Sequence, residues 1–240
     1  MHFLGASLLI FSLITPIGTD ARIGGQSNSQ VEQSPDVVEA YAVCREFQRV
    51  LAEDLDFDSA FEATFVKSPS RRLAIAMSDG EFGDQDFAEL DGKLLIRAYK
   101  LRMELLYLMM PLAGPSDAEQ AEFFPPEIKA IFQREPGPGK KVFENYVLQL
   151  DADVKTFRTH LENLARRNPL VAERIRSFKA EADSPRFVPP IDHKIEAQTA
   201  YFGRGQVLKD EAYYEIESYR VVKEDGKMRI VGLRFFTRMF

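Results

Sequence analysis

The hydrophobic period of the chain changes once, at Pro189 and Pro190, and this change constrains the fold more than any other feature. Before it, apolar residues recur at alternating spacings of four and three, the period of an amphipathic helix. After it, the chain is rich in Tyr, Phe, Val and Ile, and apolar and polar residues alternate as in a half-buried strand. The sequence therefore predicts an α+β fold, with a helical N-terminal two-thirds packed on a C-terminal antiparallel sheet of three to four strands.

Two long amphipathic helices are predicted, over residues 86–110 and 140–166. Their apolar stripes are narrow, so we expect the two helices to pack together as a long antiparallel hairpin, with an intermolecular coiled coil as the alternative. Proline and glycine divide the intervening residues 111–139 into an irregular connector with one or two short helices. The stripes consist of Leu94, Ala98, Leu101, Leu105 and Leu108, and of Phe143, Val147, Leu150, Val154, Phe157, Leu161 and Leu164.

A first helix is predicted to begin behind Ser34 and Pro35, which place an N-cap residue before proline at the first helical position. Apolar residues then recur at helical spacing over about four to five turns. The acidic segment 54–58 ends this helix, and Asp58 is predicted to cap a short second helix. The apolar residues of the first helix are Val37, Tyr41, Cys44, Phe47 and Leu51.

Residues 188–240 are predicted to form the sheet, with strands over 199–208, 212–222 and 228–237. The second and third strands are joined through residues 223–226, and the Asp-Gly pair in that loop favours a tight hairpin. We therefore expect an antiparallel meander at the end of the chain.

Residues 1–21 have the pattern of a secretory signal peptide, with a short apolar run and the small residues Thr19 and Ala21 before the expected cleavage point. The usual Lys or Arg is missing at the start, so a buried helix or an uncleaved anchor are the alternatives. Residues 22–34 are rich in Gly, Ser, Gln and Asn and predict a flexible tether. We expect an extracytoplasmic protein, periplasmic or secreted, with no transmembrane span in the mature chain and a single α+β domain over 35–240.

Charge and cysteine content exclude several classes of protein. The chain has 31 Lys and Arg against 37 Asp and Glu, a net charge of -6, so general binding of nucleic acid is not expected. Cys44 is the only cysteine, which excludes an intramolecular disulfide. Its place among apolar residues at helical spacing predicts a small buried hydrophobic side chain.

No metal and no cofactor is predicted. Asp54, Asp56 and Asp58 have the alternate spacing of a calcium loop, but Ser59 and Phe65 stand where that loop needs glycine and a bidentate glutamate. The three histidines cannot build a conventional zinc site, because one lies in the leader and no cysteine pair is present. The common serine-hydrolase and metalloprotease motifs are also absent from the sequence.

One group of residues is suited to proton transfer. His193 follows Asp192 where the helical period gives way to alternation, and Tyr201 is a candidate orienting hydroxyl on the first predicted strand. Adjacent residues of a strand point to opposite faces, so Asp192 would not orient His193 in an extended segment. A histidine in a surface loop is therefore the alternative interpretation.

The sequence resembles the nuclear transport factor 2-like superfamily at both ends of the domain. The resemblance lies in residues 52–61, a helix-to-helix turn, and in residues 219–230 of the C-terminal meander. It implies a curved antiparallel sheet that wraps helices around an internal pocket, with residues 67–185 as a large helical insertion. The superfamily includes isomerases, cyclases, dehydratases and purely binding members, so the resemblance implies no single activity.

A pocket in such a fold would be lined by aromatic residues of the strands. Gly203 and Gly205 lie on one face of the first predicted strand, where missing side chains permit a sharp bend or the close approach of a ligand. The strand aromatics are alternatively the packing face of the sheet. The candidate ligand-binding residues are Tyr213, Tyr219, Phe202 and Arg204.

These observations favour an exported protein that binds a small apolar ligand or a protein partner without catalysis. One alternative is a small-pocket enzyme of the isomerase, dehydratase or cyclase type, with His193 acting alongside a tyrosine or a carboxylate. Another is an interaction protein that uses the two long helices. The sequence leaves the partner and the oligomeric state open.

Overall fold

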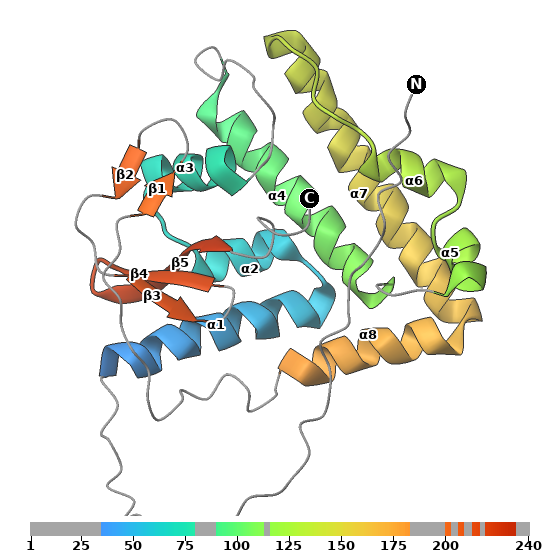
Figure 1. The fold of residues 1–240 in the computed structure, drawn as a ribbon, viewed down its shortest axis with the longest axis horizontal. Helices are drawn as coiled ribbons and strands as arrows, with labels where there is room; N and C mark the ends of the chain where they lie inside the picture. The colour runs from blue at the N-terminus through green and yellow to red at the C-terminus, as the bar shows by residue number, and fades with distance from the viewer. Residues whose placement is uncertain are drawn as a thin grey trace, which may run out of the picture.

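The computed structural model describes residues 35–79, 90–112, 116–182, 200–202, 206–208, 213–216 and 219–233. The predicted signal peptide and tether lie outside these residues. The described part is an α+β fold, as predicted (Figure 1). Its helices are α1 (Pro35–Asp54), α2 (Phe57–Thr64), α3 (Pro69–Asp79), α4 (Gly92–Met109), the 3-10 turn η2 (Met110–Leu112), α5 (Asp117–Phe123), α6 (Pro126–Phe132), α7 (Lys140–Arg167) and α8 (Pro169–Ala182). Its strands are β1 (Ala200–Phe202), β2 (Gln206–Leu208), β3 (Tyr213–Ile216), β4 (Tyr219–Glu224) and β5 (Lys227–Leu233).

The main sheet is the antiparallel meander β3-β4-β5. Asp225 and Gly226 form the two-residue loop between β4 and β5, with φ values of 50° and 77° that Asp tolerates and Gly adopts without strain. The predicted second strand is wrong in one respect, because it corresponds to two antiparallel strands, β3 and β4. The alternating sequence pattern continues from one strand into the next, so periodicity alone did not separate them.

The predicted first strand, 199–208, is also two strands. β1 and β2 pair antiparallel with each other, Tyr201 opposite Val207, and form a separate two-stranded sheet. Gly203 and Gly205 fall between these strands, outside the described residues. Figure 1 shows the small sheet beside α3, on the side of β3-β4-β5 opposite to α1.

Helix α1 packs along one face of the main sheet (Figure 1). Its predicted apolar residues, including Cys44, are buried, so the helical spacing placed them correctly. At its N-terminal end, Asp36 accepts hydrogen bonds from Lys223 Nζ at 2.7 Å and from the Tyr214 hydroxyl at 3.2 Å. The Glu39 carboxylate accepts from the backbone N–H of Met228 at 3.1 Å. These contacts tie the helix to all three strands of the meander.

Helix α2 begins two residues earlier than predicted, because Asp56 is its N-cap instead of Asp58. The Asp56 carboxylate accepts from the backbone N–H of Ser59 at 3.1 Å. Immediately after the helix, Phe65 pairs in parallel with Ile230, and the N–H of Val66 donates to the Ile230 carbonyl at 3.0 Å. The end of α2 is thereby attached to the open edge of β5.

The two long helices α4 and α7 pack together as predicted, but they run in the same direction instead of antiparallel (Figure 1). Arg97 pairs with Asp151 and, further along both helices, Glu104 pairs with Arg158, so these two ion pairs share an offset of 54 residues. The chain between them returns along α7, where Phe132 packs on Phe157 with ring centroids 5.1 Å apart. The connector with its two short helices is long enough to permit this return.

Helix α4 is buried on two faces because it lies between α7 on one side and α2 and α3 on the other. Its second face carries Leu95, Tyr99, Met103 and Tyr107, all at most 3% exposed, in addition to the predicted stripe. Among the described residues, no helix is both long enough and apolar enough to cross a membrane.

Candidate functional site

The residues predicted to act in catalysis or ligand binding are only partly described. His193, Asp192 and Arg204 lie outside the described residues, and the side chains of Tyr201 and Phe202 in β1 are likewise outside them. These assignments stay predictions. The structure describes the two remaining candidates, and Tyr213 and Tyr219 are both buried.

Tyr219 belongs to a cluster of aromatic rings between the sheet and the helices, which we call the ring core. Phe47 of α1 lies at its centre, with ring centroids 5.7 Å from Tyr219, 5.7 Å from Phe65 and 5.9 Å from Tyr107. The Tyr219 hydroxyl accepts a hydrogen bond from the Gln48 side-chain amide. The rings are at most 3% exposed and pack against one another between the sheet and the helices. The ring core consists of Phe47, Phe57, Phe61, Phe65, Tyr99, Tyr107 and Tyr219.

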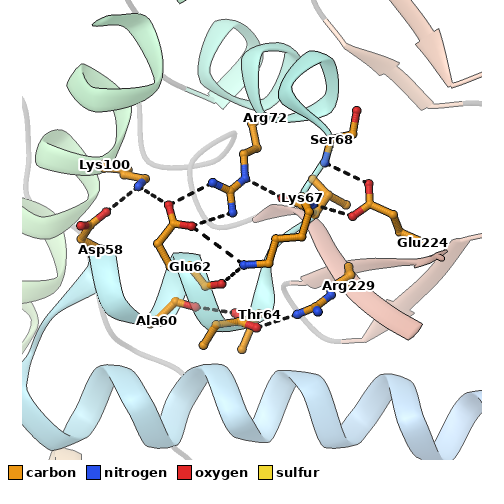
Figure 2. Close-up of polar contacts among 12 residues, drawn as sticks. Asp58, Ala60, Glu62, Thr64, Lys67, Ser68, Arg72, Lys100, Glu224 and Arg229 are labelled. Atoms are coloured by element: carbon orange, nitrogen blue, oxygen red, sulfur yellow. Dashed lines mark hydrogen bonds and ion pairs between the residues drawn. The ribbon is translucent and has the colours of Figure 1, made fainter. Parts of the chain in front are cut away.

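A charged cluster, which we call the α2 network, lies at the edge of the ring core (Figure 2). It joins α2 to the start of α3, to α4 and to the β4–β5 hairpin, which are far apart in the sequence. Figure 2 shows the charged side chains converging around the C-terminal half of α2. The α2 network consists of Asp58, Glu62, Lys67, Ser68, Arg71, Arg72, Lys100, Glu224 and Arg229.

Glu62 is the centre of the α2 network. Its two carboxylate oxygens accept from the guanidinium of Arg72 at 3.0 and 2.9 Å, the bidentate geometry that makes such pairs strong. Lys100 Nζ donates to Glu62 and lies 2.6 Å from Asp58. Partial burial raises the pKa of Glu62, but the hydrogen bonds from Arg72 and Lys100 outweigh it and hold the pKa at about 2. The carboxylate therefore stays ionised in moderately acidic solution.

Phe61 connects the α2 network to the ring core. The charged ends of Arg72 and Lys100 each lie 5.0 Å from the centroid of its ring, within the range of a cation–π interaction. The same ring stacks on Phe65 with centroids 4.4 Å apart. Phe61 itself is fully buried, so it fixes the position of both cations against the core.

Glu224, from the end of β4, caps the start of α3. Its carboxylate accepts from the backbone N–H of Lys67 and, at 3.3 Å, from that of Ser68, and it lies 3.8 Å from the guanidinium of Arg71. A carboxylate at this position satisfies N–H groups that have no partner inside the helix and interacts favourably with the helix dipole. The β4–β5 hairpin is thereby joined to α3.

Lys67 and Arg229 bind the C-terminal end of α2. At the C-terminus of α2, Lys67 Nζ donates to the carbonyl of Glu62, and an Nη atom of Arg229 donates to the carbonyl of Ala63 at 2.6 Å. Cations are favoured there because the last carbonyls carry partial negative charge. The pKa of Lys67 is lowered by desolvation and by the nearby charges of Arg72, Arg229 and Lys100. The Glu62 carboxylate, 3.9 Å from Lys67 Nζ, opposes this lowering of the pKa.

Sequence reasoning did not find the α2 network. Asp58 and Glu62 are one helical turn apart and face the same side of α2, a pattern that could have indicated a cation-binding face. Their partners come from α3 and α4, and Glu224 is 157 residues away from Lys67. Local spacing contains no information about such a distant partner.

The α2 network predicts a pH effect on stability. The pKa of Glu62 in the folded chain, about 2, is below the ordinary value of 4.5, so its contribution is complete above about pH 4.5 and is lost as the pH falls through about 2. Thermal unfolding followed by circular dichroism should show that Glu62→Gln lowers the Tm most at neutral pH, and that the difference from wild type shrinks toward pH 2. The exposed Glu162→Gln on α7 is the control, and a Glu62→Gln effect that does not change with pH would contradict the assignment.

The comparisons with known proteins found no relative. No family model, no curated protein and no solved structure matches this chain. In the described part of the chain, no three His, Cys, Asp or Glu side chains are placed so that they could hold a metal ion. The α2 network therefore has to be interpreted from its own chemistry, which is that of holding charged groups.

Proposed function

We propose that this protein is exported and binds a protein partner on its surface, without catalysing a reaction. The observation that supports the proposal is the ring core, which occupies the space where a small apolar ligand or a substrate would lie between the sheet and the helices. Phe47 is fully buried at the centre of that space. A ligand would have to displace such rings, and losing the packing of one costs about 3–5 kcal/mol.

A relationship to the nuclear transport factor 2-like superfamily is part of this proposal. It is supported by α1 packing along the antiparallel meander β3-β4-β5, which corresponds to the two ends of the domain in which the resemblance lies. The filled ring core favours one of the purely binding members over a member with an open pocket. The enzyme alternative with His193 is tested separately, by comparing His193→Ala with wild type on a panel of metabolites.

Mass spectrometry of the purified protein under native conditions tests two parts of the proposal together. We expect the chain recovered from the producing cell to begin at Arg22, after removal of residues 1–21, and to carry no bound organic molecule. A chain that retains residues 1–21 would contradict the proposed cleaved signal peptide. A stoichiometric apolar molecule that is released on unfolding would contradict the proposal that the ring core excludes ligands.

Cross-linking in the producing cell tests the partner. An amine-reactive cross-linker is expected to join surface lysines of this chain to one recurring polypeptide, identified by peptide mass mapping. The same treatment of the purified chain is the control, because it records the cross-links formed within the chain alone. If the cell yields only those cross-links, the proposed function is wrong.

A further inference from the structure

We propose that Lys67 and Arg229 bind a carboxylate side chain in an acidic segment of the protein partner. This inference rests on the proposed function, because it names the chemistry of that partner and the place where it binds. The two side chains come from the α2–α3 connection and from β5, and Figure 2 shows both directed at the C-terminal end of α2.

The first step concerns charge. The α2 network contains five cations and three carboxylates, an excess of two positive charges, although the whole chain has a net charge of -6. Glu62 is shared by Arg72, Lys100 and Lys67, whose Nζ lies 3.9 Å from it, and Glu224 is engaged by Arg71 and the backbone at the start of α3. Among the described residues no carboxylate pairs with Arg229, so the unbalanced positive charge lies at Arg229 and the adjacent, shared Lys67. A local field of opposite sign to the rest of the surface selects an acidic partner.

The second step concerns access and geometry. The Lys67 side chain is 46% exposed, whereas the side chains of Arg72 and Lys100 are 15% and 17% exposed. Arg229 uses one Nη atom for the Ala63 carbonyl, which is the one hydrogen bond it makes with the described residues. Its Nε and second Nη atom form the edge that pairs with both oxygens of a carboxylate. The Lys67 ammonium has further N–H donors for the same group.

Binding of a carboxylate would change the pKa of Lys67. Desolvation and the neighbouring cations hold the pKa of Lys67 below its ordinary value, although the Glu62 carboxylate opposes them. A carboxylate placed next to Lys67 compensates this repulsion, and so the pKa of Lys67 should rise when the site is occupied. A purely structural helix cap would leave this property unchanged when an acidic ligand is added.

Hexaglutamate is the probe for the test, added to the full chain at low salt. We expect Lys67→Gln/Arg229→Gln to weaken binding, measured by fluorescence anisotropy of the labelled peptide, by about tenfold, which corresponds to about 1.4 kcal/mol. Glutamine at each position removes the charge and keeps an amide N–H donor on a shorter side chain. The matched control is Lys155→Gln/Arg176→Gln, two exposed cations on α7 and α8, which should bind as wild type does. Equal weakening by both double variants would overturn the assignment.

A second measurement uses the wild-type chain, so its result does not depend on whether the double variant folds. NMR with 13C-labelled lysine is expected to show the Lys67 side chain shifting on addition of hexaglutamate, and its pKa rising, while Lys155 changes little. If the Lys67 resonance does not move at saturating peptide, the site is wrong. Displacement of hexaglutamate by an equal concentration of inorganic phosphate would overturn the assignment to carboxylates.

The failure of the site and the failure of the proposed function can be distinguished. If hexaglutamate binds at Lys67 and Arg229 but no protein is cross-linked in the cell, the carboxylate site stands and the proposed function fails. If a protein is cross-linked in the cell and the cross-links are equally abundant in Lys67→Gln/Arg229→Gln, the proposed function stands and the site fails.

Discussion

Replacing Phe47 by Ala is expected to lower the free energy of unfolding by about 3–5 kcal/mol. The ring is fully buried and contacts rings from α2, α4 and β4, with centroids 5.7–6.0 Å away. Its removal leaves a cavity at the point where the sheet meets the helices, and the surrounding rings are fixed by their own neighbours. Because such a cavity cannot collapse, the loss of unfolding free energy should lie at the upper end of this range.

Chemical denaturation of the variant and the wild type measures this loss directly. Val38→Ala is the control on the same helix, because Val38 is 48% exposed and its truncation should change stability by less than about 0.5 kcal/mol. Phe47→Leu should fall between the two. A loss below about 1 kcal/mol for Phe47→Ala would mean that the space is not filled, and the argument against an internal ligand would fail with it.

The second large effect is expected at Arg158. Its replacement by Ala should lower the free energy of unfolding by about 3 kcal/mol at pH 7. Arg158 donates to the Glu104 carboxylate and, at 3.0 Å, to the carbonyl of Leu55, so it joins α7, α4 and the α1–α2 turn. Glu104 is only 9% exposed, and burial raises its pKa although the hydrogen bond from Arg158 opposes the rise. Without Arg158, the Glu104 carboxylate loses the positive charge that compensates for its burial.

Two further measurements separate this electrostatic cost from lost packing. Adding Glu104→Gln to the Arg158→Ala variant should recover much of the stability, because it removes the charge that was left without its partner. The cost of Arg158→Ala should also shrink as the pH falls, since the raised pKa of Glu104 means that protonation stabilises the folded state at low pH. An identical loss in the Glu104→Gln background would show that the Arg158 stem acts by packing alone.

Several parts of the fold that follow from local patterns were predicted correctly. The buried face of α1 follows from its helical spacing, and the Asp-Gly loop between β4 and β5 follows from the φ values that only such residues adopt easily. The bounds of α7 agree within one residue of the prediction because no glycine or proline interrupts the segment. These features depend on residues that are neighbours along the chain.

The candidate site could not be predicted from the sequence, because its residues come together only in the tertiary structure. The α2 network needs Glu224 next to Lys67 and Lys100 next to Glu62, and both pairs are made by tertiary packing alone. The ring core is another such case, since Tyr99 and Tyr107 lie off the predicted stripe of α4 and are buried because a second layer covers that face.

By itself, then, the sequence determined that this chain is α+β, which segments are helical and where the C-terminal meander makes its tight turn. The hydrophobic period and the turn-forming residues are local features, so they can be interpreted without knowing which distant residues pack against them. The tertiary structure alone decided that α4 and α7 run in the same direction, that rings fill the space beneath the sheet and that Lys67 and Arg229 meet at one helix end. Those outcomes depend on the path by which connectors return the chain and on pairs of residues distant in sequence, which no local pattern records.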